Sequence, residues 1–146
     1  MANETRHIRD VMTPNPKTVT ERDSVRDAAR IMKEQDAGVV PVVDGKKVIG
    51  MITDRDIVVR LIAEEKNPLE ATVKDAMTRS VNKVKEDATI SEVVTLMSSS
   101  EIRRVPVVNN RDEIVGIVSI GDLAAGGEKS KVGQAMEQIS QAPPNN

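Results

Sequence analysis

The sequence contains no cysteine, phenylalanine, tryptophan or tyrosine. Without cysteine the chain can form no disulfide bond, thiolate nucleophile or cysteine-ligated zinc site, and this composition is typical of proteins in a reducing compartment. Without aromatic rings the core must consist of valine, isoleucine, leucine and methionine, and base stacking of the kind that single-strand-binding proteins use is excluded. Any planar ligand must therefore lie against aliphatic side chains.

The usual features of exported, membrane and nucleic-acid-binding proteins are also missing from the sequence. It has no apolar run of about 18 residues, and its first stretch, MANETRHIRD, is too polar for the apolar region of a signal peptide. The formal net charge is −2 with both signs interspersed, so the chain offers no basic face to a phosphate backbone. We therefore expect a cytoplasmic protein that binds neither membranes nor duplex nucleic acid.

The most informative feature that is present is an internal repeat. Residues 11–57 align with residues 76–123 at an offset of 65, which becomes 66 after one extra residue in the second copy. At equivalent positions the copies share a Met-Thr pair, a Pro-Val-Val triplet, and then a glycine, a hydroxyl residue and an aspartate. The last three are Gly50, Thr53 and Asp56 in the first copy and Gly116, Ser119 and Asp122 in the second.

Each copy predicts the element order β-α-β-β-α. A short strand, near residues 18–19 or 83–84, precedes a helix with Ser24 or Thr89 as its N-cap, because an acid follows each of them three residues later. Two runs of β-branched residues around a turn then predict a hairpin, and the glycine inside its second strand indicates close approach by another segment. A second helix begins at the shared hydroxyl residue.

The repeat predicts an α+β fold with two such units, residues 6–63 and 72–125, joined by a polar linker. Each unit has a sheet face to cover, so we expect the two to pack about a pseudo-twofold axis as one module. The unrepeated tail, residues 126–146, contains one stretch, Ser130 to Gln141, with the periodicity of an amphipathic helix.

The repeated residues resemble those of CBS domains, the cystathionine-β-synthase type unit that occurs in tandem pairs called Bateman modules. The chain looks like the stand-alone bacterial members of this family. Gly38 to Pro41 match the first family signature, a glycine-led turn into a strand, whereas Arg103 to Pro106 keep the proline and replace the glycine with arginine. The second signature, Gly-hydrophobic-any-Thr/Ser-any-any-Asp, is matched twice, at residues 50–56 and 116–122.

The resemblance implies a non-catalytic regulatory or sensor module. Such a module binds an adenosyl ligand, AMP, ADP, ATP, NAD or S-adenosylmethionine, in the cleft between its units, and it changes its interaction with a protein partner in trans. The residue chemistry agrees with this implication. A hydroxyl residue at a helix start lies near backbone amides that suit phosphate, and arginine can bind phosphate through two parallel hydrogen bonds. Aspartate can accept both hydrogen bonds of a ribose diol. The expected contacts of the first copy are phosphate with Thr53 and Arg55, ribose with Asp56, and adenine with Val19, Val40, Ile52 and the backbone near Thr18.

The second copy departs from this pattern. Ser119 and Asp122 keep the hydroxyl and the ribose acid, but no arginine stands between them. Arg103 or Arg104 could supply the missing positive charge. We therefore expect stronger ligand binding at Asp56 than at Asp122.

Two non-regulatory interpretations of the signature compete with ligand binding. The stretch from Thr53 to Asp56 could be a capped helix start that binds nothing. Alternatively, Asp54 and Asp56 could hold a catalytic metal, but the sequence supplies no further carboxylate cluster, lysine-bearing phosphate loop or histidine base, and the lone His7 has no ligating neighbour. We therefore expect no enzymatic activity and no metal site.

A third alternative is a structural or interaction module that dimerises without a nucleotide. The resemblance implies a homodimer, and the small and apolar residues within helical stretches 28–32 and 93–97 suit contact between two copies. This alternative is compatible with ligand binding, because a ligand between the units would shift the population of dimer arrangements.

Overall fold

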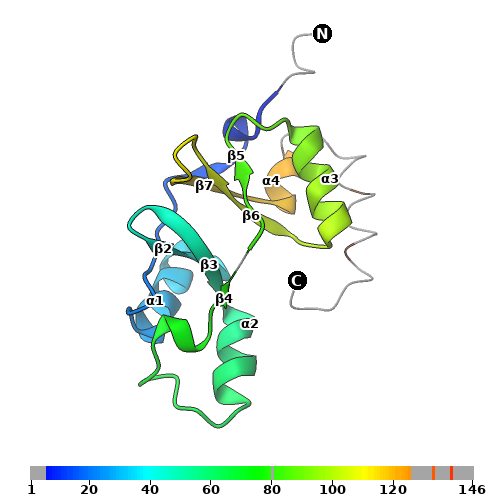
Figure 1. Cartoon of the computed structure of the whole chain (residues 1–146). Coiled ribbons are helices and arrows are strands. Elements are labelled where there is room, and N and C mark those ends of the chain that lie inside the picture. Colours follow the sequence, from blue (N-terminus) through cyan, green and yellow to red (C-terminus); the bar gives the residue numbers. More distant parts are fainter. Residues whose placement is uncertain (1–5, 80, 126–132, 134–138, 140–146) are drawn as a thin grey trace. The chain divides into compact units, whose positions relative to one another are not determined.

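The computed structural model describes residues 6–79, 81–125, 133 and 139. It combines helices and strands in the α+β manner that the repeat predicts (Figure 1). None of the helices within this described part of the chain is long and apolar enough to cross a membrane.

The chain forms two compact units. Residues 16–81 make the continuous unit, and residues 1–15 together with 82–146 make the split unit. Each unit contains one hairpin, one long helix before it and one short helix after it, so the element order of the repeat is confirmed at this level.

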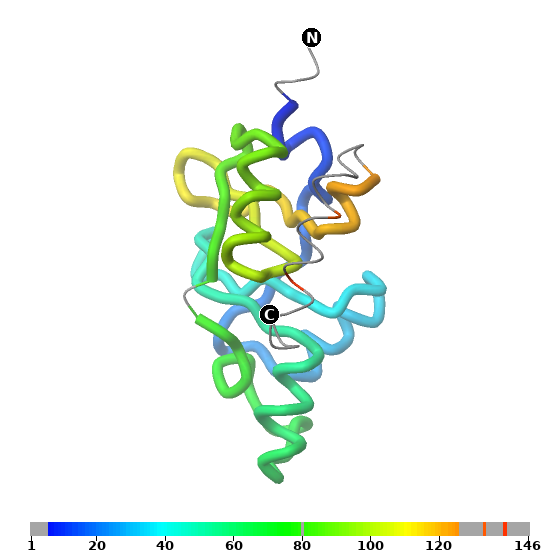
Figure 2. The backbone as a smooth tube through the Cα atoms, turned by 90° about the vertical axis from the view of Figure 1, so that its right-hand side faces the viewer, coloured from blue at the N-terminus to red at the C-terminus, as the bar shows by residue number. Residues whose placement is uncertain are grey.

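The continuous unit is built on a three-stranded antiparallel sheet in the order β2-β3-β4. A parallel bridge between Val19 and Val42 adds one residue pair beside β2, where the sequence predicts a short strand. The helix after the hairpin begins as a four-residue α-helix and continues as a π-helix, and the two form one coil in the backbone trace (Figure 2). The elements are α1 (Val25–Gln35), β2 (Val39–Asp44), β3 (Lys47–Thr53), α2 (Asp54–Ile57), η3 (Val58–Ile62), η4 (Val73–Asp75) and β4 (Thr78–Arg79).

The split unit repeats this plan with a sheet in the order β1-β7-β6-β5. Here the predicted short strand is a regular one, because β5 pairs with β6 in parallel at two positions. The elements are η2 (Ile8–Asp10), β1 (Thr13–Pro14), β5 (Val84–Lys85), α3 (Ile90–Ser100), β6 (Arg104–Val108), β7 (Ile114–Ser119) and α4 (Ile120–Ala125).

The compact units exchange the segments that begin the two sequence copies. β1, from the start of the first copy, pairs with β7, and β4, from the start of the second copy, pairs with β3. This exchange explains the glycines inside the strands, since a Cβ atom on Gly50 would collide with the carbonyl oxygen of Thr78 and one on Gly116 with the sulfur of Met12. The predicted close approach is confirmed, and its partner in each case is the exchanged segment.

The two long helices begin at the predicted caps. The hydroxyls of Ser24 and Thr89 each accept a hydrogen bond from the backbone amide three residues along, at 3.0 and 3.1 Å. Both helices end at a residue in the left-handed conformation, Asp36 at φ 50° and Glu101 at φ 57°. Glycine is the usual residue at that position, so both ends carry backbone strain.

Each unit has its own aliphatic core. The apolar positions of α1 and α3, including Ala28, Met32, Val93 and Met97, are at most 8% exposed and pack inside their own units. The prediction that these helical stretches offer a dimer contact is therefore wrong for these side chains. Apolar surface is exposed instead on η3, at Val58, Val59 and Ile62.

The predicted tail helix falls largely outside the described residues. Gly133 and Ile139 are described, and both are helical. Ile139 is 3% exposed and belongs to the core of the split unit.

Candidate functional site

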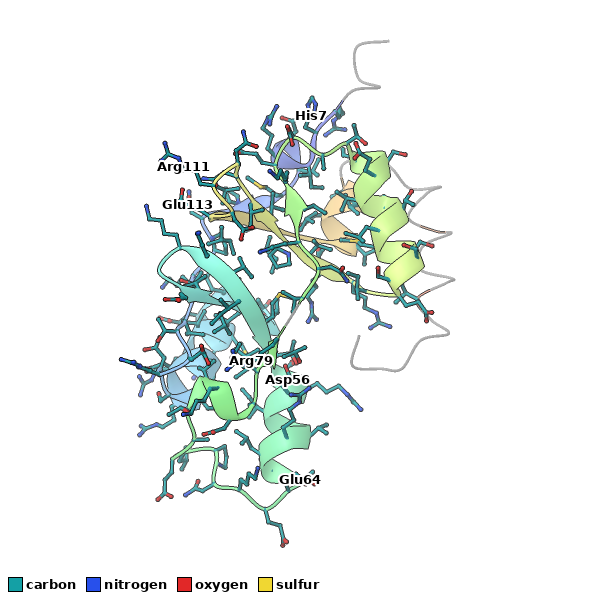
Figure 3. The ribbon with its side chains drawn as sticks, in the orientation of Figure 1. His7, Asp56, Glu64, Arg79, Arg111 and Glu113 are labelled. Carbon is teal, nitrogen blue, oxygen red and sulfur yellow. The ribbon has the colours of Figure 1, made fainter. Side chains whose placement is uncertain are left out.

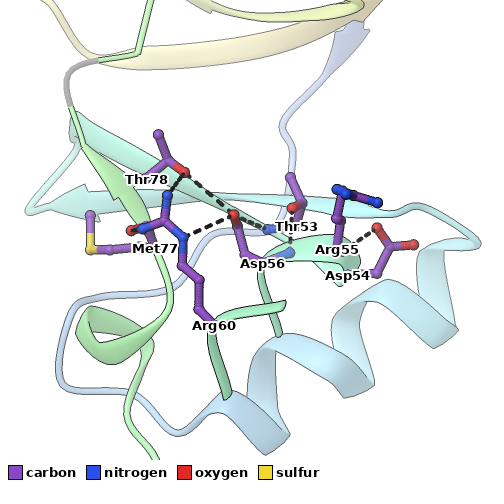
Figure 4. A network of polar contacts seen from close by, with 7 residues as sticks. All are labelled: Thr53, Asp54, Arg55, Asp56, Arg60, Met77 and Thr78. Carbon is purple, nitrogen blue, oxygen red and sulfur yellow. Dashed lines mark hydrogen bonds and ion pairs between the residues drawn. The ribbon is translucent and has the colours of Figure 1, made fainter. Parts of the chain in front are cut away.

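The signature segment of the continuous unit is positioned by the turn from β3 into α2. Thr53 is the N-cap of α2, and its hydroxyl accepts a hydrogen bond from the amide of Asp56 at 3.0 Å. In return, Oδ2 of Asp56 accepts a hydrogen bond from the amide of Thr53, also at 3.0 Å (Figure 4). This reciprocal arrangement is a capping box, and it holds the two signature side chains in fixed positions relative to each other.

The second carboxylate oxygen of Asp56 is also in use. Nε of Arg60 lies 3.6 Å from Oδ1, and the hydroxyl of Thr78 donates to the same oxygen at 3.5 Å (Figure 4). Asp56 is 6% exposed, and it is the one buried charged residue in the described part of the chain. Figure 3 labels Asp56 on α2, the helix that Thr78 of β4 reaches through its contact with Oδ1.

Arg60 and Thr78 were not identified from the sequence. Arg60 stands four residues after Asp56, a spacing that predicts an ion pair on one helix face, so this contact could have been found. Thr78 could not, because it comes from the exchanged segment and reaches the site only through the pairing of β4 with β3.

Asp54 links the two family signatures of the first copy. Its amide donates to the carbonyl oxygen of Gly38 at 3.0 Å, and a Cβ atom at Gly38 would lie 2.9 Å from its carboxylate oxygen. Asp54 also accepts a hydrogen bond from the amide of Arg55 at 2.8 Å. The Asp54 carboxylate packs against Gly38, so a side chain at position 38 would have to displace it, and this packing together with the amide bond favours a structural role for Asp54. The side chain of Arg55 is exposed.

The aliphatic residues predicted to contact adenine lie in the core. Val19, Val40 and Ile52 are 3%, 0% and 0% exposed, and all three belong to the core of the continuous unit. The backbone of Val19 bonds to β2 through both its amide and its carbonyl, at 3.0 and 2.8 Å. Thr18 is the one residue of this predicted group with partly exposed surface.

The signature of the split unit has the same reciprocal bonds. The amide of Ser119 donates to Oδ2 of Asp122 at 2.9 Å, and the amide of Asp122 donates to the Ser119 hydroxyl at 3.2 Å. Arg104 is the direct cross-strand partner of Ser119, and the carbonyl of Arg103 accepts from the amide of Ile120 at 2.9 Å. Directly opposed side chains in an antiparallel pair lie on the same face, so the structure brings the Arg104 position beside the Ser119 hydroxyl within one unit.

Two carboxylates outside the signatures have perturbed pKa values. The hydrogen bond from Arg79 lowers the pKa of Glu21, and this ion pair ties β4 to the turn before α1. The backbone amide of Thr72 lowers the pKa of Asp75, because the two residues form another capping box, with an amide-to-carboxylate distance of 2.9 Å. Both shifts follow from local bonds that favour the charged form.

The described residues contain no group of three or more histidine, aspartate or glutamate side chains that could hold a metal ion. His7, labelled in Figure 3, is the N-cap residue of η2 and forms an isolated bridge with Thr89.

Comparison with known proteins gives consistent matches. The CBS domain family matches residues 8–63 and 73–126. The chain is 41% identical over 137 residues to the uncharacterized protein YlbB of Bacillus subtilis, covering 92% of this chain and 91% of that protein. The match therefore extends over nearly the full length of both proteins.

Solved structures show the same fold. Hypoxic Response Protein I with two coordinated zinc ions is 34% identical with a TM-score of 0.74, covering 82% of this chain and 98% of that one. The CBS domain pair of MJ0100 in complex with 5′-methylthioadenosine and S-adenosyl-L-methionine is 31% identical with a TM-score of 0.73, covering 82% and 98%. CBSX2 of Arabidopsis thaliana in complex with AMP is 26% identical with a TM-score of 0.71, covering 86% and 98%.

Proposed function

Because the chain belongs to the CBS-domain family, as a pair of such domains, we propose that it is a non-catalytic regulatory module that binds an adenosyl ligand. The ligand class comprises AMP, ADP, ATP, NAD and S-adenosylmethionine. The observation that carries the proposal is the capped signature, which occurs once in each unit with the same pair of reciprocal hydrogen bonds. Its support from relatives is that solved CBS pairs hold AMP in one case and S-adenosylmethionine with methylthioadenosine in another.

The polar residues have defined roles in this proposal. Asp56 and Asp122 accept hydrogen bonds from the ribose hydroxyls, as acidic residues do in other nucleotide sites. Thr53 and Arg55 hold phosphate in the first copy, and Ser119 with Arg104 does so in the second, where the arginine comes from the strand rather than from the helix. Guanidinium groups suit this role because they form charge-assisted bonds to phosphate.

The predicted adenine contacts have less support than the polar contacts. Contact of the base with Val19, Val40 and Ile52 requires these buried side chains to become accessible. Thr18 and the backbone beside it remain the part of the predicted adenine contact that has exposed surface already.

A second function, dimerisation that signals to a protein partner in trans, is favoured by the exposed apolar side chains of η3. Val58, Val59 and Ile62 are 53%, 43% and 54% exposed. Apolar surface of this kind is typical of protein contacts. A homodimer in which a ligand changes the arrangement of the protomers combines the two functions.

Isothermal titration with AMP, followed by the other members of the ligand class, tests the binding proposal. We expect saturable binding to the wild-type chain and a loss of about tenfold or more at each site whose aspartate is replaced, since a hydrogen bond to a charged group contributes about 1.5–3 kcal/mol. The double variant Asp56→Ala/Asp122→Ala should therefore show little binding. Asp75→Ala is the matched control, because it removes an equivalent capping box outside both signatures, and it should bind like the wild type. Equal affinities for all variants would contradict the ribose assignment.

A further inference from the structure

Arg60 holds three groups at once. Besides its ion pair with Asp56, its guanidinium donates to the carbonyl oxygen of Met77 at 3.0 Å and to the hydroxyl of Thr78 at 3.4 Å (Figure 4). The arginine therefore joins the signature aspartate to the backbone just before β4 and to the side chain of Thr78 in β4. It lies on η3, and π-helical turns of this kind occur frequently at functional sites.

The bonds of Asp56 leave little room for a ribose. A ribose diol presents two hydroxyl donors to a carboxylate, but Oδ2 already accepts from the Thr53 amide and Oδ1 already faces Arg60 and Thr78. The side chain of Asp56 is 8% exposed, whereas that of Arg60 is 47% exposed. A ligand that approaches Asp56 therefore meets Arg60, and Arg60 is the partner that can move into solvent because its own side chain is already half exposed.

The second copy provides an internal comparison. Asp122 makes the same capping bonds as Asp56, but the described residues place no cation at its carboxylate. At the offset of 66 the residue equivalent to Arg60 is Gly126, which has no side chain to offer. Among the residues that the structure describes, one signature aspartate has an arginine over it and the other has none.

We propose that the Arg60 side chain covers the Asp56 carboxylate until a ligand displaces it. This cover weakens ligand binding at Asp56 and makes Asp122 the stronger site. This inference rests on the proposed function, and it reverses the order expected from the sequence. Displacement of Arg60 also removes its bonds to Met77 and Thr78, so occupation of Asp56 loosens β4. The continuous unit ends at Val81, two residues after β4, so this loosening acts where the chain passes into the split unit.

The test uses AMP titrations in the Asp122→Ala background, where binding at Asp56 is measured alone. Arg60→Met keeps an unbranched side chain and removes the charge. We expect it to tighten AMP binding about two- to fivefold, the effect of losing one weak ion pair. Arg60→Gln should act in the same direction and guards against a folding defect in the first variant. Arg30→Met is the matched control, because Arg30 forms an exposed ion pair with Asp27 at 3.2 Å on α1, and it should leave the affinity unchanged.

A second measurement follows hydrogen exchange in strand β4. AMP should accelerate hydrogen exchange of the Thr78 and Arg79 amides when Arg60 is present, and both Arg60 variants should show that faster exchange without AMP. If the wild type binds and both Arg60 variants bind equally or more weakly, the cover is refuted while the proposed function stands. If neither the wild type nor any Arg60 variant binds an adenosyl ligand, both fail. Binding that appears only after Arg60 is replaced supports the cover directly.

Discussion

Replacement of Asp56 by alanine should destabilise the chain more than the same replacement of Asp122. Both changes remove the acceptor of a capping bond, a loss of about 1 kcal/mol for an N-terminal cap. Asp56→Ala additionally removes the ion pair with Arg60, worth about 0.2–1 kcal/mol, and the long contact with Thr78. Since Arg60 is 47% exposed, it can turn to solvent, and no buried charge is left without a partner. We therefore expect a loss of about 1.2–2 kcal/mol for Asp56→Ala and about 1 kcal/mol for Asp122→Ala.

Urea unfolding followed by far-ultraviolet circular dichroism measures this difference, since a chain without tryptophan or tyrosine gives no useful intrinsic fluorescence. Two compact units can unfold at different urea concentrations, so the transitions are fitted separately. A double-mutant cycle of Asp56→Ala with Arg60→Met should give a coupling of about 0.2–1 kcal/mol. Equal losses for the two aspartate variants, together with zero coupling to Arg60, would refute the reasoning.

Three further predictions concern the fold. Gly50→Ala should lower the free energy of unfolding by about 1–3 kcal/mol, and Gly116→Ala should lower it less. The added Cβ atom meets a backbone carbonyl at Gly50, whereas at Gly116 it first meets a flexible methionine side chain. Thermal melts of both variants measure the difference. Glu101→Gly should raise the stability by about 0.5–1 kcal/mol, since it relieves a left-handed helix end at φ 57°, and an unchanged or lower urea midpoint would contradict this. The bond with Arg79 lowers the pKa of Glu21, so this bond stabilises the fold fully above the ordinary pKa of 4.5. Its contribution is lost as the pH falls through the lowered pKa. The stability difference between the wild type and Glu21→Gln should therefore shrink below pH 4.5.

The sequence predicts those parts of the fold that depend on local signals. Ser24 and Thr89 cap helices because the acid or amide that completes each cap lies within three residues. The exchange of β1 and β4 between the copies could not be predicted in detail, because two-residue strands carry almost no pattern of their own. Its one signal was the glycine at positions 50 and 116, which indicates a close neighbour without identifying it.

The candidate site likewise has contacts that local sequence signals predict and contacts that they do not. Thr53 and Asp56 are linked by their spacing alone, and the structure brings them together. Val40 and Ile52 lie in two aliphatic runs, one in each strand of the hairpin, that are apolar on both strand faces. The pattern therefore cannot separate core positions from ligand-facing ones, and both residues are in the core. The contact of Asp56 with Thr78 depends on tertiary pairing and has no local signal at all.

The most direct test of the central claim is a calorimetric melt of the wild-type chain, alone and with millimolar AMP, ADP, ATP, NAD or S-adenosylmethionine in turn. A ligand present at about 100 times its dissociation constant adds about 2.7 kcal/mol of stability, which corresponds to a rise in Tm of about 5–10 °C for a chain of this size. We predict such a rise with at least one of the five, and its loss in the Asp56→Ala/Asp122→Ala variant. An unchanged Tm with all five would contradict the claim that this CBS pair binds an adenosyl ligand, and would leave the dimerising module as the better account.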